Sequence, residues 1–295
     1  MSADRLNTTG SLLLEAPAKI NLSLLVTGRR PDGYHLLDSV IVFAGTHDRI
    51  AIRSHDALTL EIAGPFGRGL EAGEDNLVMR AARALAAQAG VTAGAALTLE
   101  KNLPVSSGIG GGSADAAAAL IGLNRLWDCG LDDQALRALG LTLGADVPVC
   151  LFGHPARVRG IGEDIEPLPF GPAAGLLLVN PGIAVSTPEV FGRRIGAFSA
   201  ETAPPGSGVN SPQTLAAWLS GLNNDLEAPA KTVCPVISHV LGALSGAEGC
   251  HLARLSGSGA TCFGIFDDLA AADNAAPGIA AQNRSWWVSA TEIRS

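Results

Sequence analysis

The stretch Leu103–Leu120, LPVSSGIGGGSADAAAAL, places four glycines among the five positions 108–112 and then a run of alanines. Glycine has no Cβ, so an anion can approach the backbone closely there. A helix is expected over about residues 114–127, and the free N–H groups and dipole of a helix N-terminus attract phosphate. The stretch therefore predicts a phosphate-binding loop rather than a ligand-free turn, with added hydroxyl donors from Ser106, Ser107 and Ser113.

Two familiar phosphate loops fit this stretch poorly. The Walker loop requires a lysine in G-x-x-x-x-G-K-[ST], and the stretch contains none. The dinucleotide fingerprint G-x-G-x-x-G would start at Gly108 but end on Ser113, far from the N-terminus. A nicotinamide-dependent oxidoreductase therefore stays open only as a weaker alternative. We expect Asp115, in the first helical turn, to complement the helix dipole from the outer face.

Lys19 and Asp146 are the side chains whose chemistry would suit transfer of a phosphoryl group to a hydroxyl. That reaction needs an aspartate to accept the hydroxyl proton and a cation to stabilise the developing charge. Asp146 lies in GADVPV, between an expected helix end and an apolar segment. Lys19 alternates with apolar residues in a predicted half-buried strand, so it shares one face with Asn21 and Ser23. An exposed strand lysine and an ordinary helix-end aspartate are the alternatives.

The remaining pattern mixes strands and helices and predicts an α+β protein of two lobes. We expect strands over residues 12–26, 36–43, 49–53, 57–62, 95–101 and 176–179, with 49–53 and 57–62 as a pair, and an SGSG turn before a strand within 255–266. We expect helices over 77–89 (capped by Asn76, stopped by Gly90), 114–127, 133–143, 215–222 and 233–244, and a short apolar segment over 147–152. Proline, glycine and serine suggest a boundary at 167–175 and a mobile loop at 200–212.

Composition narrows the class of protein. The 295 residues carry a net charge of −8 with no cluster of basic residues, which argues against a nucleic-acid partner. The five cysteines are odd in number and show no C-x-x-C spacing, so we expect them to be reduced. Neither a signal peptide nor a membrane-spanning run is evident, which predicts a cytoplasmic protein without a membrane partner.

Four stretches together resemble the GHMP kinases: APAKINLSLLVTGRRPDGYH, PVSSGIGGGSADAA, LTLGADVPVCLFG and LSGSGATCFGIF. The resemblance runs from about Glu15 to Phe266. It implies the two-lobed GHMP kinase fold, with residues 1–170 as an N-terminal domain, residues 171–295 as a C-terminal domain and the active site in the cleft between them. It also implies ATP as phosphoryl donor with Mg²⁺. Ser113 offers a hydroxyl to Mg²⁺, but no carboxylate cluster marks a metal site, so the metal ligands are left unknown.

The same resemblance implies the roles of individual residues. Asp146 would be the catalytic base, and Lys19 would pair with it and orient the acceptor. Tyr34, the one tyrosine, and His35 would contact a cytidine base, with Phe191 flanking it and Asn21 lining the substrate site. Residues 256–260 would pack beside the phosphate loop and Asn76 would lie near the nucleotide. ATP would bind Pro104, Val105, Ser106, Ser107, Gly108, Ile109, Gly110, Gly111, Gly112, Ser113 and Ala114.

The implied substrate is a small molecule, a methylerythritol linked to cytidine diphosphate and phosphorylated on its 2-hydroxyl. One position departs from the family pattern, because Ile41 stands six residues after His35 where an aromatic residue is common. Stacking of the base would then be one-sided unless Phe43 compensates. A GHMP kinase for another small alcohol and a noncatalytic nucleotide-binding module stay open as alternatives. The protein is expected to be a monomer or homodimer.

Overall fold

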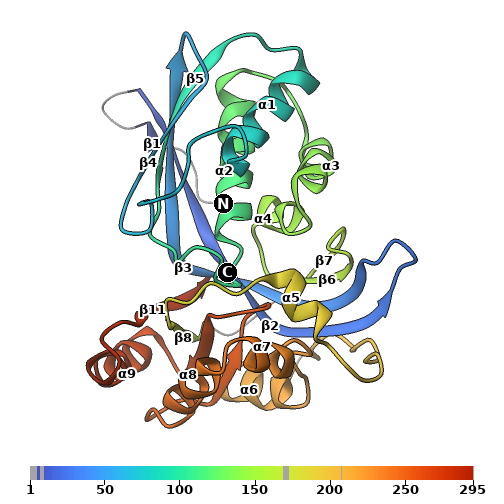
Figure 1. Ribbon diagram of the computed structural model, residues 1–295, viewed down its shortest axis with the longest axis vertical. Coiled ribbons are helices and arrows are strands. Elements are labelled where there is room, and N and C mark those ends of the chain that lie inside the picture. The colour runs from blue at the N-terminus through green and yellow to red at the C-terminus, as the bar shows by residue number, and fades with distance from the viewer. Residues whose placement is uncertain (1–4, 7–9, 169–172, 207, 295) are drawn as a thin grey trace. The chain divides into compact units, whose positions relative to one another are not determined.

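The computed structural model describes residues 5–6, 10–168, 173–206 and 208–294 (Figure 1). It contains two compact units whose segments interleave along the chain. The first unit holds Met1–Ala18, His47–Val105 and Gly110–Gly153, and the second holds Lys19–Thr46, Ser106–Ile109 and His154–Ser295. The division into domains at residue 170 stays a prediction, and part of its boundary segment lies outside the described residues.

The sheet of the first unit contains a parallel pair that was not expected. The segments predicted to pair with each other, at 49–53 and 57–62, both pair instead with the strand at 94–100, antiparallel and parallel respectively. A parallel pair needs a long crossover, and here a helix provides it. The strands are β1 (Arg5–Leu6), β2 (Leu12–Arg29), β3 (His35–His55), β4 (Thr59–Ala63) and β5 (Gly94–Glu100), of which β2 and β3 continue into the second unit.

The helices of the first unit are α1 (Leu77–Ala89), α2 (Gly111–Leu126), α3 (Asp133–Leu143) and α4 (Val147–Phe152). The bounds predicted for α1 are confirmed: Asn76 Oδ1 accepts the N–H of Val78 at 3.0 Å, and Gly90 ends the helix with φ of 66°. The apolar segment at 147–152 is helical, with Pro148 in its first turn, where a missing N–H costs little.

The long helix α2 rests on the sheet of its unit through a glycine. A Cβ at Gly122 would lie 2.5 Å from Cδ1 of Ile52 and 2.7 Å from Cδ1 of Leu14, so a larger residue would force the ends of both side chains to move. The alanines 116–119 are likewise buried. Small residues therefore let the axis of α2 lie close to β2 and β3.

The second unit is built on an antiparallel sheet with the strand order β3-β11-β8-β10-β9. Its central strand, β8, is buried at every position, which explains its continuous apolar sequence, GLLLVN. The strands first met here are β6 (Ala156–Gly160), β7 (Asp164–Pro167), β8 (Gly175–Asn180), β9 (Leu252–Leu255), β10 (Cys262–Phe266) and β11 (Trp287–Arg294).

The described part of the second unit contains the helices α5 (Thr187–Gly192), α6 (Pro212–Ser220), α7 (Glu227–Val233), α8 (Val236–Ser245) and α9 (Leu269–Gln282). The helix expected over 215–222 begins three residues earlier, at a capping box formed by Ser211 and Thr214. The helix expected over 233–244 begins only at Val236, because Pro235 separates α7 from α8.

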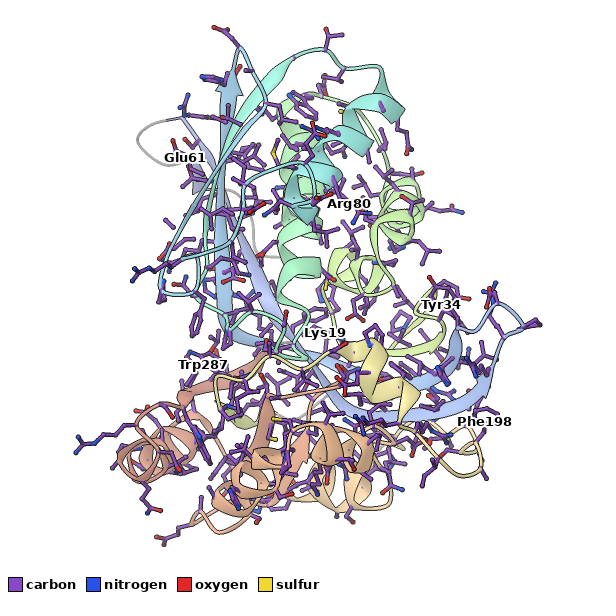
Figure 2. All side chains as sticks on the ribbon, in the orientation of Figure 1. Lys19, Tyr34, Glu61, Arg80, Phe198 and Trp287 are labelled. Atoms are coloured by element: carbon purple, nitrogen blue, oxygen red, sulfur yellow. The ribbon has the colours of Figure 1, made fainter. Side chains whose placement is uncertain are left out.

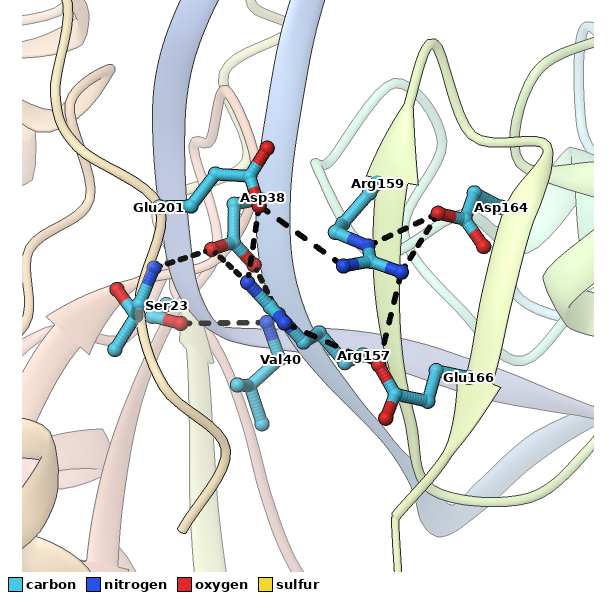
Figure 3. A network of polar contacts seen from close by, with 9 residues as sticks. Ser23, Asp38, Val40, Arg157, Arg159, Asp164, Glu166 and Glu201 are labelled. Atoms are coloured by element: carbon cyan, nitrogen blue, oxygen red, sulfur yellow. Dashed lines mark hydrogen bonds and ion pairs between the residues drawn. The ribbon is translucent and has the colours of Figure 1, made fainter.

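A buried ion pair anchors the start of the segment 200–212 in the second unit (Figure 3). Arg157 of β6 donates two hydrogen bonds of 2.9 Å to the carboxylate of Asp38 on β3. The same carboxylate accepts the backbone N–H of Thr202 at 2.7 Å, and Glu201 lies 3.5 Å from the Arg157 guanidinium. The two-pronged geometry is the strong form of this interaction.

No helix among the described residues is long and apolar enough to cross a membrane. The five cysteines all lie within the described residues, and none of them forms a disulfide bond.

The packing of α2 generates a test of stability. We expect Gly122→Ala to lower the free energy of unfolding by about 1–3 kcal/mol, because the added methyl overlaps Ile52 and Leu14. Gly242→Ala in α8 is the matched control, because a Cβ there meets nothing within 4 Å. The control should be neutral or stabilise by about 0.5–1 kcal/mol, since alanine favours a helix. Urea denaturation measures both variants; equal effects would contradict this account of the packing.

Candidate active site

The stretch predicted to bind phosphate is a loop that runs directly into α2. The helix begins at Gly111, three residues before the predicted start, so Gly111 and Gly112 are helical. Its N-cap, Gly110, has φ of 64° and makes no side-chain cap hydrogen bond. No side chain therefore competes at the cap for the first N–H groups of the helix, which is what a phosphate site requires.

The glycines of the loop have different functions. A Cβ at Gly108 would lie 2.5 Å from the carbonyl oxygen of Ser256 and 2.7 Å from the backbone nitrogen of Gly259, so this glycine is needed for packing. A Cβ at Gly112 would meet no atom within 4 Å. The space over Gly112 is thus open, as expected for a position that approaches a ligand.

The loop tip 106–109 and the SGSG element belong to the same unit and lie against each other. The Ser256 hydroxyl donates to the carbonyl of Gly108 at 3.1 Å, and the N–H of Thr261 donates to the carbonyl of Ser107 at 3.0 Å. The placement of residues 256–260 beside the phosphate loop therefore agrees with the resemblance.

The polar face predicted for β2 is real, but the strand is buried on both faces from Ala16 to Val26. Lys19, Asn21 and Ser23 are 4%, 3% and 2% exposed. The Lys19 ammonium donates to Oδ1 of Asn21 at 3.0 Å, and the Asn21 amide donates to the Ser39 hydroxyl at 2.8 Å. Ser39 in turn donates to the Ser23 carbonyl at 2.6 Å. A buried ammonium needs such partners, because burial without them costs several kcal/mol.

This polar face also reaches the phosphate loop. The backbone N–H of Lys19 donates to the carbonyl of Ile109 at 2.9 Å. The N–H of Asn21 donates to the Ser256 hydroxyl at 3.2 Å. Within the second unit, the structure thus brings together Lys19, Asn21 and the loop tip.

Asp146 lies in the first unit, at the N-cap of α4, with φ of −86° and no side-chain cap hydrogen bond. It is partly exposed. The following residues 147–150 are buried, so α4 holds the position of the aspartate while its carboxylate is not used to cap the helix.

Two of the three residues expected at the base, His35 and Phe191, stack on each other. The rings of His35 and Phe191 lie with centroids 4.9 Å apart and an interplanar angle of 22°. Burial lowers the pKa of His35 below its ordinary value of 6.5, and the charges of Arg29 and Arg194 lower it further. A neutral imidazole can both donate and accept, which suits the polar edge of a pyrimidine base.

Tyr34 is 60% exposed at the turn between β2 and β3, where Figure 2 labels it. Its carbonyl accepts the N–H of Arg30 at 2.7 Å, so the backbone of the turn is fixed. Ile41 and Phe43 are 2% and 0% exposed. The idea that Phe43 compensates for the missing aromatic residue at position 41 is therefore wrong, because its ring has no accessible face.

The prediction that Asp115 lies on the outer face of α2 is wrong, and its partners Lys101 and Asp48 were not predicted. Asp115 is 3% exposed and faces inward, and its Oδ2 accepts the ammonium of Lys101 at 2.7 Å. Asp48 also accepts from that ammonium. Because α2 begins at Gly111, Asp115 lies beyond the first turn. At that position the helix dipole stabilises a carboxylate only weakly. Burial raises the pKa of Asp115 to about 7, against the opposing effect of Lys101.

Asn76 has an ordinary structural role, since its amide caps α1 and also donates to the carbonyl of Glu71 at 3.0 Å. Among the described residues, no three His, Cys, Asp or Glu side chains form a group that could hold a metal ion.

Comparison with known protein families identifies two domains. Residues 76–154 match the GHMP kinases N terminal domain, and residues 209–284 match the GHMP kinases C terminal domain. The first match contains the phosphate loop and Asp146.

Relatives of known name match nearly the whole chain. A protein named 4-diphosphocytidyl-2-C-methyl-D-erythritol kinase from Paramagnetospirillum magneticum is 49% identical, covering 97% of this chain and 99% of its own length. One of the same name from Cereibacter sphaeroides is 52% identical, covering 92% and 96%.

Solved structures confirm the expected α+β fold. A crystal structure of 4-(cytidine 5'-diphospho)-2C-methyl-D-erythritol kinase matches with a TM-score of 0.77 and 34% identity, covering 96% of this chain and 99% of that one. A homoserine kinase from Cytophaga hutchinsonii matches with a TM-score of 0.69 over 99% of this chain; at 19% identity it shows the fold alone.

Gly112 and Gly108 of the loop provide a matched pair of tests. We expect Gly112→Ala to fold at least as stably as the wild type, because alanine favours a helix, yet to weaken nucleotide binding roughly tenfold or more by filling the open space. Gly108→Ala should instead lower stability through overlap with Ser256 and Gly259. Calorimetric titration with ADP and thermal unfolding separate the two effects. Unchanged ADP affinity in Gly112→Ala would mean that phosphate does not approach this position.

Proposed function

We infer the function from the family: the chain belongs to the GHMP kinases and, within them, to the 4-diphosphocytidyl-2-C-methyl-D-erythritol kinases. It is an ATP-dependent kinase of a small molecule. We propose that it transfers the γ-phosphoryl group of ATP to the 2-hydroxyl of 4-diphosphocytidyl-2-C-methyl-D-erythritol.

The observation that carries the choice of substrate within the superfamily is the stacked pair of His35 and Phe191. An alcohol such as homoserine or mevalonate has no aromatic group for such a pair to recognise. A cytosine offers a π-face for Phe191 and hydrogen-bonding groups for a neutral His35. We place Tyr34 and Asn21 in the same substrate site.

We propose the following roles in the reaction. The 2-hydroxyl oxygen forms a bond to the γ-phosphorus, the bond from that phosphorus to the bridging oxygen breaks, and ADP leaves. Asp146 accepts the proton of the hydroxyl, and Lys19 orients the acceptor and stabilises negative charge. The hydrogen bond from Lys19 to Asn21 limits the ammonium to a small range of positions, which reduces the cost of orientation.

ATP binds, in this proposal, along residues 104–114, with its phosphates over the uncapped start of α2. Mg²⁺ bound with the nucleotide would neutralise phosphate charge. The Ser113 hydroxyl, in the first turn of α2, is the protein group we assign to it.

The first test compares acceptors and the proposed base. With Mg-ATP, we expect transfer to the cytidyl substrate and none to homoserine or mevalonate. Asp146→Asn should bind ATP normally but lose about 10²–10⁴-fold in kcat, because the amide cannot accept the proton. Asp132→Asn, at the N-cap of α3 in the same unit, is the matched control and should keep its kcat.

Near-normal turnover in Asp146→Asn would remove this residue from the mechanism. Transfer to another alcohol would keep the kinase and replace the substrate. ATP binding without transfer to any acceptor would favour the noncatalytic alternative.

The second test uses pH. The folded protein favours neutral His35, because burial and the two arginines lower its pKa below 6.5. The KM for the cytidyl substrate should therefore be constant above that pH and rise as the pH falls through the lowered pKa. His35→Ala should raise KM and abolish this dependence. His239→Ala, an exposed histidine of α8, should leave the profile unchanged; a pH-independent KM in the wild type would contradict the role of His35.

A further inference from the structure

The proposed reaction leaves one buried cluster of charges in the first unit unused. Asp48 on β3, Lys101 just after β5 and Asp115 on α2 are 0%, 4% and 3% exposed. Lys101 lies between the two carboxylates, donating to both. The three residues come from segments far apart in the sequence, yet they enclose one ammonium group.

The cluster contacts the chain at both ends of the phosphate loop. On the strand side, Oδ1 of Asp48 accepts the backbone N–H groups of Asn102 at 2.5 Å and Leu103 at 2.8 Å. On the helix side, Lys101 donates to Asp115 at 2.7 Å. The Lys101 ammonium also lies 3.4 Å from the place where a Cβ on Gly111, the first residue of α2, would stand. The two ends of the loop, at Leu103 and at Gly111, therefore lie next to the same cluster.

Stability alone explains this cluster poorly. Two carboxylates share one ammonium, and Oδ1 of Asp115 has no hydrogen-bond partner among the described residues. Desolvation of buried charges often exceeds their mutual attraction, and an apolar set of the same volume is frequently as stable. The energetics therefore favour a role in geometry.

Lys101 is also a poor candidate for a direct phosphate ligand. Burial alone would lower its pKa, but Asp115 and Asp48 together raise it above the ordinary value. The ammonium already donates to both carboxylates. The cluster as a whole carries no net positive charge with which to attract a phosphate.

We propose that Asp48, Lys101 and Asp115 are positioning residues, which set the spacing between the strand end and the start of α2 and thereby the affinity of the loop for nucleotide phosphates. This inference rests on the proposed binding of ATP along residues 104–114. Misplacement of binding groups by about 1 Å can cost about 10²-fold, so a small change of spacing is enough.

Three variants distinguish an effect of the spacing between the strand end and α2 from an effect of the charge of the cluster. Lys101→Met removes the link but keeps an unbranched stem, and Asp115→Leu replaces the carboxylate with a larger, apolar group that branches at the same atom. Both should raise the Kd for ADP and the KM for ATP roughly tenfold or more, with the KM of the cytidyl substrate within about twofold of wild type. Asp115→Asn keeps an oxygen that can accept from Lys101, so it should bind ADP nearly as the wild type does.

Asp38→Asn is the matched control, because it makes the same chemical change in the buried ion pair with Arg157 in the second unit. It should lower stability without changing the ADP affinity. Urea denaturation of all four variants shows which are folded, and calorimetric titration with ADP requires no acceptor. The readout therefore remains valid if the assigned acceptor is wrong.

ADP affinity within twofold of wild type in folded Lys101→Met or Asp115→Leu would overturn the proposal. So would tighter ADP binding in Asp115→Asn, since it would show that the cluster acts by charge. If ADP does not bind the wild type at all, the proposed function itself fails, and that result is distinct from either of these.

Discussion

The start of α2 must present free backbone N–H groups, and much of the described structure meets that constraint. A helix normally recruits a serine, threonine or aspartate to cap its first turn. Here the N-cap is Gly110, in a left-handed conformation that glycine adopts without strain. An uncapped helix start is costly unless a ligand or water satisfies it. An uncapped start of this kind is the arrangement that the proposed phosphate site requires.

A loop with so many glycines loses more conformational entropy on folding than an ordinary loop, so its backbone must be held by its surroundings. In the second unit, the hydroxyl of Ser256 and the N–H of Thr261 bind two carbonyls of the loop tip. In the first unit, Asp48 binds two N–H groups at the strand end. Each contact uses a backbone group of the loop, so the path of the chain depends little on which side chains the loop carries.

The polar groups buried along β2 are likewise held in place by hydrogen bonds to their surroundings. A buried lysine is tolerated only with partners, and Asn21 provides one while itself donating to Ser39. Each member limits the rotamers of the next, so the ammonium of Lys19 is oriented before any substrate arrives. His35 is adapted differently: burial and two nearby arginines keep it neutral, which preserves its ability both to donate and to accept.

The sequence by itself determined the features with local causes. The period of apolar residues, Asn76 and Gly90 gave the bounds of α1. The glycines of the loop predict an anion site, which stays a prediction. The spacing of Lys19, Asn21 and Ser23 placed them on one face, because strand geometry alternates side chains. The family motifs supplied the kinase class and the roles proposed for Lys19 and Asp146, which local patterns alone left open.

Only the tertiary structure decided which distant segments meet. β5 lies between β3 and β4, and Asp115 is enclosed with Lys101 and Asp48 rather than exposed on the surface of α2. Strand partners and buried charge clusters arise from contacts across tens of residues, where neighbouring sequence carries no signal. The physical reason is that burial is a property of the packed chain: the same aspartate is solvated on one face of a helix and desolvated on the other.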